Sequence, residues 1–238
     1  MDIYYDFHIH SALSPCGSLD MTPNNIINMA SLKGLDVIAL TDHNACGNCA
    51  AVMELGRRAG LIVLPGMELC TAEEAHVLCL FPKLDNALEF DKYVKEHIIK
   101  VKNKPDVFGQ QCFMDENDEI TGYEEYLLLT ATSISIDNAA KLAGEYGGVA
   151  IPSHIDRPAY SVISSLGFIA PEMGFHTLEL SCGTSKEDTV NKYPYLNKGY
   201  RFIRDSDAHS LEFISERENC IETNGKEPEQ IISALSIL

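Results

Sequence analysis

Short apolar runs of strand length alternate with helix-like segments along most of this chain, and this alternation limits the folds open to it. The runs expected to be strands are 3–10, 36–40, 61–64, 76–81, 148–151, 177–180 and 201–203. The expected helices are 22–32, 48–60, 84–102, 137–146, 161–166 and one that begins near Pro228. Strands that alternate with helices pair in parallel through right-handed crossovers. The sequence therefore predicts an α/β fold, with residues 1–238 forming one domain.

The segment from 105 to 135 interrupts this alternation. At its centre the polar run 114–119 has the composition of a turn and predicts the tip of a hairpin. Insertions of this length lie at the surface of a fold, and some of them cover a functional site. The insertion is thus either a lid or a surface elaboration, and we favour the surface elaboration.

The charge of the chain bears on its partners. It has 18 basic and 35 acidic residues, which is a formal net charge of -17 at pH 7. Such a surface repels nucleic-acid backbones and anionic membranes, so we expect no stable binding of duplex nucleic acid. No apolar run approaches the length of a membrane span, so we expect a soluble protein without a membrane partner. A small phosphorylated substrate fits this charge where bound metal ions make a pocket locally positive. The sequence does not indicate the oligomeric state.

Eight cysteines are scattered along the chain. The N-terminus carries Asp2 and Asp6 and no basic patch before its apolar stretch, which argues against a secretory signal. We therefore expect a cytoplasmic protein with reduced thiols rather than a disulfide framework. Cys46 and Cys49 form a lone CxxC, which is a redox pair, half of a zinc site, or two small residues that pack at a helix start. We favour the last interpretation because no second pair completes a zinc site.

Two histidines and an acid lie on the first expected strand. Residues two apart on a strand point the same way, so His8 and His10 share a face, with Asp6 behind them. Phe7 and Ile9 are then expected to face the opposite layer. A lone His-x-His is a weak signal, and a distant Asp-x-His, at Asp207 and His209, makes it considerably stronger.

Four more residues of metal-ligand type follow the C-terminal ends of different apolar runs: His43, Glu68, His154 and Asp207. His209 comes two residues later and repeats the spacing of the first pair. In α/β folds ligands bind at the C-terminal edge of the strands, and in barrels catalytic residues collect there. Nitrogen and oxygen ligands gathered at one edge predict a pocket that holds several hydrolytic metal ions.

The other three histidines lie differently along the chain. His76 precedes its apolar run, so it reaches the same edge only where its strand runs antiparallel to the strand before Glu68. The short connection 69–75 allows such a hairpin. His97 lies among charged residues of an expected helix, and His176 precedes a strand on the side away from the site. We interpret both as structural or surface residues.

Taken together, these motifs resemble those of the PHP family, the polymerase and histidinol phosphatase domain. They are His8-x-His10, Thr41-Asp42-His43, Gly66-x-Glu68, His76, Ser153-His154 and Asp207-x-His209, and their order matches over nearly the whole chain. The resemblance implies a distorted (β/α)7 TIM-like barrel with two or three divalent ions, of zinc, manganese or iron, at its C-terminal mouth. One ion would be held by His8, His10, Glu68 and Asp207. Glu68 would bridge to a second ion held by His76 and His154, and His43 and His209 would hold a third.

The third ion needs one more ligand, and here the chain departs from the family. Members usually supply a His or Asp in the loop after the His-x-His strand, where this chain has Cys16. A thiolate binds zinc or ferrous iron well and manganese poorly. We favour Cys16 as the ligand, and Asp20, a few residues further along, is the alternative.

The resemblance implies a metal-dependent phosphoesterase that acts on a phosphomonoester, a nucleotide or a short oligonucleotide. With Glu68 bridging two ions, a hydroxide shared between them would attack phosphorus in line. Charge gathers on the phosphoryl oxygens, so a cation should face the ions. Arg157 suits this role through its planar fork, and a surface ion pair with Asp156 or another acid is its alternative. Arg204 is a weaker candidate, and Asp42 either orients a ligand histidine or caps a turn.

Two other functions remain open at the level of the sequence. The first is a metal-dependent regulatory or binding module without catalysis, since some PHP-like domains are accessory parts of polymerases. The second is an amidohydrolase that cleaves carbon–nitrogen bonds, which also uses His-x-His on barrel strands. The carboxylated-lysine motif of that family is not evident in this chain, so the Glu68 bridge favours phosphoester chemistry.

Overall fold

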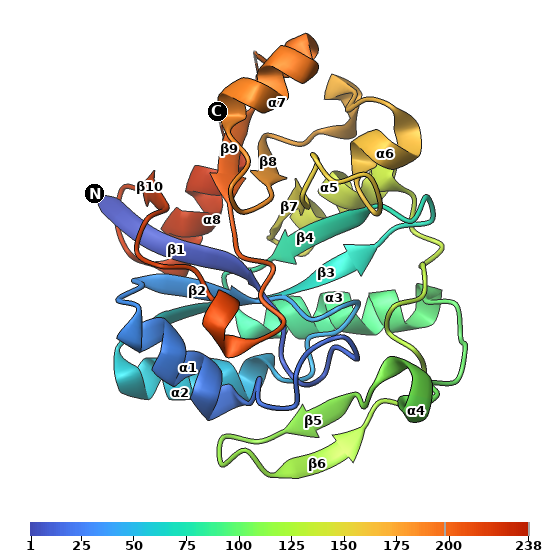
Figure 1. The fold of residues 1–238 in the computed structure, drawn as a ribbon, viewed down its shortest axis with the longest axis vertical. Helices are drawn as coiled ribbons and strands as arrows, with labels where there is room; N and C mark the ends of the chain where they lie inside the picture. The colour runs from blue at the N-terminus through green and yellow to red at the C-terminus, as the bar shows by residue number, and fades with distance from the viewer. Residues whose placement is uncertain (198, 238) are drawn as a thin grey trace.

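The computed structural model describes residues 1–197 and 199–237 and shows a curled sheet flanked by helices (Figure 1). The strands are β1 (Asp2–Ile9), β2 (Val37–Leu40), β3 (Ile62–Cys70), β4 (His76–Leu80), β5 (Cys112–Met114), β6 (Ile120–Tyr123), β7 (Val149–Pro152), β8 (Thr177–Leu180), β9 (Arg201–Arg204) and β10 (Cys220–Glu222). The α-helices are α1 (Pro23–Leu32), α2 (Cys49–Ala59), α3 (Leu84–His97), α4 (Pro105–Phe108), α5 (Ile136–Glu145), α6 (Val162–Leu166), α7 (Lys186–Lys192) and α8 (Pro228–Ser236). Short 3-10 helices are η1 (Pro171–Met173), η2 (Pro194–Asn197) and η3 (Leu211–Phe213).

The strand order explains how distant parts of the chain meet. The main sheet has the order β10-β1-β2-β3-β4-β7, and β8 pairs with β9 in a separate sheet. β1, β2 and β3 are parallel, as are β8 and β9, which confirms the parallel pairing predicted for these runs. β4 is antiparallel to both β3 and β7, and this confirms the hairpin that brings His76 towards Glu68.

Sparse contacts join the β8–β9 pair to both sides of the main sheet. Just after β7, the Ile155 amide donates to the carbonyl of Glu179 in β8 (3.0 Å). Beyond β9, Ala208 forms an isolated parallel bridge with Ile9 of β1, and the His10 amide donates to its carbonyl (3.0 Å). The fold is therefore mixed α/β with a curled, half-barrel sheet. Among the described residues the ladder does not run unbroken around seven strands, so the closed (β/α)7 barrel is found only in part.

Two apolar layers lie on opposite faces of the curled sheet. The larger layer joins the sheet to α1, α2, α3 and α5, through side chains such as Ile26, Val52 and Phe90. Figure 1 shows the first three of these helices together below the strands. The second layer lies on the other face, where Ile231 and Leu235 of α8 cover the sheet.

The expectation that Phe7 and Ile9 face the same layer is wrong. Phe7 packs in the layer under α8, whereas Ile9 packs in the layer with the outer helices. The reason is a register shift between Asp6 and Ile9 in the pairing of β1 with β2. An irregularity of this kind re-aims side chains at the end of a strand, and here it comes where His8 and His10 leave the sheet.

Two element boundaries differ from the expected ones. The helix predicted over 84–102 ends at His97, and Ile98 is extended (φ -71, ψ 142). Ile98 bridges to Thr132, and Lys102 bridges to Tyr126, because β-branched residues in 98–101 favour a strand-like conformation. The strand predicted over 61–64 continues to Cys70, so Glu68 lies inside β3 rather than after it.

The insertion at 105–135 contains the hairpin that was predicted. β5 and β6 pair antiparallel, and they lie at the bottom of the view in Figure 1. Asp115 forms the tip by accepting hydrogen bonds from the amides of Asn117 (2.8 Å) and Glu119 (3.0 Å). The insertion also returns to the sheet, because the turn after Tyr126 accepts hydrogen bonds from Asn44, beyond the end of β2.

The CxxC pair is buried at the start of α2. The thiols of Cys46 and Cys49 both point to the carbonyl of Gly66, at 3.2 and 3.5 Å. Each residue is 1% exposed, and burial raises the pKa of Cys46 well above its usual value. These contacts agree with the interpretation as packed small residues. In the part of the chain that the structure describes, none of the helices has the length and apolar character that crossing a membrane requires.

Candidate metal centre

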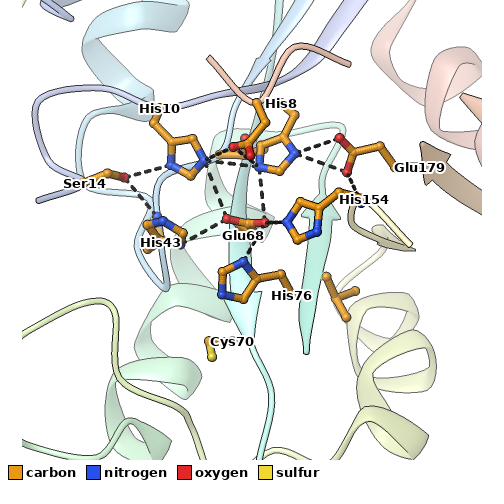
Figure 2. A network of polar contacts seen from close by, with 12 residues as sticks. His8, His10, Ser14, His43, Glu68, Cys70, His76, His154 and Glu179 are labelled. Atoms are coloured by element: carbon orange, nitrogen blue, oxygen red, sulfur yellow. Dashed lines mark hydrogen bonds and ion pairs between the residues drawn. The ribbon is translucent and has the colours of Figure 1, made fainter. Parts of the chain in front are cut away.

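Six histidines and two acids from across the chain meet at one end of the curled sheet. Figure 2 shows five of the histidines around Glu68. Each comes from the end of a strand or from a loop beside it: His8, His10, His43, Glu68, His76, His154, Asp207 and His209. Three groups have the residue types and mutual distances to hold a cation. They are His8–His10–Glu68–Asp207, His43–Glu68–His76 and His10–His43–His209. The structure thus brings together the histidines and acids singled out in the sequence.

Glu68 lies at the centre of the cluster and is 1% exposed. Its Oε1 is 3.0 Å from Nδ1 of His76 and 3.2 Å from Nε2 of His154. Its Oε2 is 3.0 Å from Nδ1 of His43. Backbone pairing fixes this position, because the Glu68 amide donates to the Asp42 carbonyl (3.0 Å) and the Asn44 amide donates to the Glu68 carbonyl (2.9 Å). The two carboxylate oxygens therefore face different histidines.

Hydrogen bonds to the outer ring nitrogens aim two of the histidines inward. Nδ1 of His8 donates to the carboxylate of Glu179 at 2.9 and 3.2 Å. Nδ1 of His10 lies 2.9 Å from the Ser14 hydroxyl. That hydroxyl donates to Asp42 (2.7 Å), so it accepts from His10. With Nδ1 used as donor, Nε2 of each ring faces the cluster, which is the arrangement of a metal-binding histidine.

The inner atoms of the cluster lie at the spacing expected of ligands around one cation. Nε2 of His8 lies 3.1 Å from Nε2 of His10, and both lie 3.2 Å from Oδ1 of Asp207. Ligands of one tetrahedral ion, each 2.0–2.2 Å from it, stand about 3.3 Å apart. Nδ1 of His43 is buried and, although close to Glu68, is not aligned for a hydrogen bond with any described residue. The donor set therefore fits divalent metal ions.

The pKa values of three cluster histidines are shifted because their rings are buried close to other titratable groups. Burial disfavours the charged ring of His8, but Glu179, Asp207 and Glu68 raise its pKa well above the usual value. Burial likewise opposes charge on His76, and Glu68 raises its pKa to about 10. Burial lowers the pKa of His10 well below the usual value, and the nearby rings of His209 and His43 add to this. The cluster thus favours the charged form of His8 and His76 and the neutral form of His10.

Two of these residues hold strained backbone. His154 has φ 31 and Asp207 has φ 52. Positive φ is uncommon outside glycine and asparagine and costs about 1 kcal/mol or more, so it persists where the surroundings enforce it. The His154 amide donates to Glu179 (3.1 Å), which helps to enforce it.

Cys16 lies beside the third group, and Asp20 does not. Sγ of Cys16 is 3.1 Å from Nε2 of His209, and the Ser18 amide donates to the His209 carbonyl (2.8 Å). Burial and the nearby charge of Glu68 raise the pKa of Cys16 to about 12. Asp20 is exposed, and its described contacts in this loop are through its backbone, with the amide donating to Ser18 and the carbonyl accepting from Asn25.

Arg157 pairs with a residue of the cluster, not with its neighbour Asp156. Its Nη1 is 2.5 Å from Oδ2 of Asp207, and its Nε donates to the Ser181 hydroxyl (3.2 Å). Asp156 instead accepts from the Ser181 amide (2.8 Å) and the Thr184 hydroxyl (2.9 Å). Arg204 donates to the Thr184 carbonyl (2.7 Å), and none of its described contacts reaches the cluster.

Asp42 orients a ligand histidine, and its carboxylate holds the loop after β1 instead of capping the turn that follows it. Its carboxylate accepts from the amide (2.8 Å) and hydroxyl (2.6 Å) of Ser11, which fixes the loop after β1. Through Ser14 it also orients His10. His97 and His176 lie outside the cluster, and Nδ1 of His97 bonds to the Tyr93 carbonyl (2.7 Å).

Glu179 and Ser14 were not among the residues predicted from the sequence. Glu179 is 0% exposed within β8, and it contacts both His8 and the backbone of His154. A lone acid inside the apolar run 177–180 was the available signal, since charged residues are seldom fully buried without a partner. Ser14 had no comparable signal, because its role depends on two residues that only the fold brings to it.

A cavity of about 330 Å³ opens beside the cluster. Its lining includes Glu68, His76 and Asp207 of the cluster together with Leu129, Arg157 and Tyr160. This volume lies at the small end of the range for small-molecule sites, roughly 300–1,000 Å³. The cavity is therefore lined by polar groups of the cluster and by an apolar wall to which Leu129 and Tyr160 contribute.

The comparisons with known proteins agree with this architecture. A model of the PHP domain matches residues 6–164, so the chain belongs to the PHP domain family. An uncharacterized protein of Methanocaldococcus jannaschii is 34% identical over 76 residues, which cover 29% of this chain and 44% of that protein. The chain thus spans less than half of that relative.

Solved structures show the same fold at low sequence identity. The lesion-specific Endonuclease Q of Pyrococcus furiosus matches with a TM-score of 0.72 and 20% identity, over 99% of this chain and 56% of that one. A protein of Bifidobacterium adolescentis, assigned as a metal-dependent phosphoesterase, matches with a TM-score of 0.66 and 17% identity, over 95% of each chain. The chain therefore spans little more than half of the endonuclease.

The expectation that net charge excludes duplex nucleic acid is wrong. A structure of Endonuclease Q with a 27-mer duplex substrate matches 99% of this chain with a TM-score of 0.69. The fold thus occurs in a protein that binds duplex DNA at its active site. Net charge describes long-range repulsion, whereas a metal-lined site is governed by local charge.

Proposed function

We propose that this chain is a metal-dependent phosphoesterase whose ions are held by the cluster around Glu68. The observation that carries the proposal is the position of Glu68, a buried carboxylate with each oxygen turned to different histidines. A carboxylate placed in this way suits a bridge between two ions, and paired ions clamp the oxygens of a phosphoryl transfer.

We assign the ligands from the three groups. His8, His10, Glu68 and Asp207 hold the first ion. Glu68, His76 and His154 hold the second, since both histidines contact Oε1 of Glu68. His43 and His209 hold the third, and Cys16 beside His209 completes it. The family membership supports ions at this place, with zinc, manganese and iron as the candidates.

Bound divalent ions supply Lewis acidity and lower the pKa of water towards neutrality. The residues of the chain do the remaining work. Glu68 and Asp207 fix the ions and neutralise their charge, while Glu179 and Ser14 hold His8 and His10 in the binding tautomer. Arg157 lines the cavity with its side chain 40% exposed, so its guanidinium is available to a phosphoryl oxygen.

We also interpret β1, β2, β3, β4, β7, β8 and β9 as an opened form of the seven-stranded barrel implied by the family. The contacts of Ile155 with Glu179 and of Ile9 with Ala208 support this interpretation. It places the cluster at the barrel mouth, where catalytic residues collect in such folds.

The test is phosphate release by protein reconstituted with manganese, zinc or iron. The panel contains an aryl phosphate, nucleotides, a short oligonucleotide and a duplex with an abasic site, the last because of the Endonuclease Q fold. We expect turnover of at least one member, and a loss of about 100-fold or more in Glu68→Gln. Turnover at the wild-type level in His8→Ala or Glu68→Gln would sink the mechanism.

A matched control and two alternatives complete the design. His176→Asn removes a histidine outside the cluster and should leave turnover unchanged. A non-catalytic module would bind metal and substrate without turnover of any member. An amidohydrolase would release no phosphate but would cleave an amide panel, which is assayed in parallel.

A further inference from the structure

The apolar wall of the cavity comes from two segments that the metal cluster does not require. Tyr160, from the loop between β7 and α6, and Leu129, from the insertion, both line it. Tyr160 is 53% exposed, which is high for an aromatic ring beside a buried site. An exposed ring that lines a cavity can contact a bound ligand.

Tyr160 is held in place by strained backbone and by contacts at both ends. Its φ is 55, its carbonyl accepts from the His76 amide (2.9 Å), and its ring stacks on the His76 ring with centroids 4.9 Å apart. The next residue, Ser161, caps α6 and donates to the Arg157 carbonyl (2.8 Å). The ring is thus preorganised, with one face on His76.

Leu129 is fixed as firmly, and by a residue next to the cluster. Asn44 donates from Nδ2 to the carbonyls of Leu128 (2.8 Å) and Thr130 (3.0 Å). Its Oδ1 accepts from the Cys70 amide (2.8 Å). The carboxamide of Asn44, 1% exposed, therefore clamps the turn that carries Leu129 against β3. This clamp ties the insertion to the site.

We propose that Tyr160 and Leu129 bind a planar ring carried by the phosphoester, and so select aryl or heteroaromatic substrates over aliphatic ones. This inference rests on the proposed function. The cation of Arg157, the cluster and the two apolar side chains all line this one cavity. A flat aromatic face accepts any planar ring by stacking, whereas an aliphatic chain gains much less from it.

The test compares para-nitrophenyl phosphate with glycerol 2-phosphate in metal-reconstituted protein. Tyr160→Leu should lower kcat/KM for the aryl ester about tenfold, the scale of one lost stacking contact, and leave the aliphatic ester within about twofold. Tyr160→Phe keeps the ring and should retain the wild-type preference. Leu129→Ala should reduce the aryl preference without touching His76.

Three results would overturn the inference. Equal losses on both esters in Tyr160→Leu would mean that the ring only supports His76, and no loss on either would mean that it does nothing. Calorimetric titration with phenylphosphonate and methylphosphonate separates this inference from the proposed function. A wild-type preference for phenylphosphonate that Tyr160→Leu abolishes supports the ring site even in a protein without turnover, and equal affinities refute it.

Discussion

The carboxylate of Glu179 binds His8 through both of its oxygens, at 2.9 and 3.2 Å from Nδ1. The same carboxylate accepts from the backbone amide of His154 (3.1 Å). One buried acid thus positions ligand candidates from two strands. A second contact of this kind usually sets the tautomer and basicity of a ligand histidine, and its loss weakens metal binding.

Glu179→Gln should therefore weaken metal binding about tenfold and Glu179→Ala up to about 100-fold. Glutamine still accepts from Nδ1 but has lost the charge, whereas alanine has lost both. Competition with a chromophoric zinc chelator measures the affinity. Glu172→Gln, at an exposed position, is the matched control, and an equal effect there would contradict the assignment.

Ser14 and Asp42 should behave as one unit. Asp42 reaches His10 only through the Ser14 hydroxyl, so Ser14→Ala and Asp42→Asn should each weaken metal binding about tenfold. Because both changes break the same path, the double variant should bind no more than a few-fold weaker than either single variant. Additive losses, measured by the same competition titration, would show that the two residues act separately.

Arg157→Met should lower kcat/KM for the turned-over phosphoester by about 10²–10³-fold, the scale for losing one preorganised donor to a developing charge. Arg157→Lys should recover only part of this, since an ammonium cannot reproduce the planar fork. Arg204→Met removes an arginine that bonds to Thr184 instead of the cluster and is the control. Steady-state kinetics at matched metal content decides the outcome.

Low pH should reduce the free energy of unfolding through protonation of Asp36, the residue before β2. Partial burial opposes its charge, but the Tyr4 amide and the cations Lys226 and Arg217 hold its pKa below the usual value. A depressed pKa in the folded state means that its stabilisation is present above the unfolded pKa of about 3.9 and is lost as pH falls towards the lower folded pKa.

Asp36→Asn should therefore cost about 1 kcal/mol at pH 7 and progressively less below pH 4. Urea unfolding at several pH values measures this difference. A cost that stays constant from pH 7 to pH 3 would show that charge at this position does not contribute. Glu74→Gln, for which no contact to a cation is found among the described residues, provides a baseline.

Much of the site was predictable because it depends on local rules. The two-residue spacing of His8 and His10, and the short connection before His76, each specify an edge of the sheet without knowledge of the whole fold. Glu179 and Ser14 were not predictable in this way, because each acts on a residue that the chain brings close only after folding.

Some features of the fold were also predictable from the sequence, and others were not. The helix over 22–32 was readable from the sequence, and the structure has it as α1, which Thr22 caps. The register shift that separates Phe7 from Ile9 was not readable, because it depends on how β1 meets β2. Ile98, which follows His97, was assigned to a helix, whereas its bridge to Thr132 gives it a strand-like conformation.

Removal of metal should lower the thermal stability as well as the activity. One ion at 100 times its dissociation constant stabilises the folded state by about 2.7 kcal/mol, which for a chain of this size corresponds to about 5–10 °C in Tm. Thermal scans with and without chelator measure the shift. Glu68→Gln, which lacks the proposed bridge, should show little response, and an equal response would place the stabilising metal elsewhere.

The two seams of the curled sheet, where the backbone ladder between strands is interrupted, lie next to the proposed ligands. His154 stands at the seam between β7 and β8, and Asp207 and His8 stand at the seam between β9 and β1. Cations held there would link the strands on the two sides of each seam, where backbone hydrogen bonds of the ladder are missing. Metal binding and closure of the curled sheet would then be coupled. The supply of metal in the cell would therefore govern the lifetime of the folded molecule as well as its turnover rate.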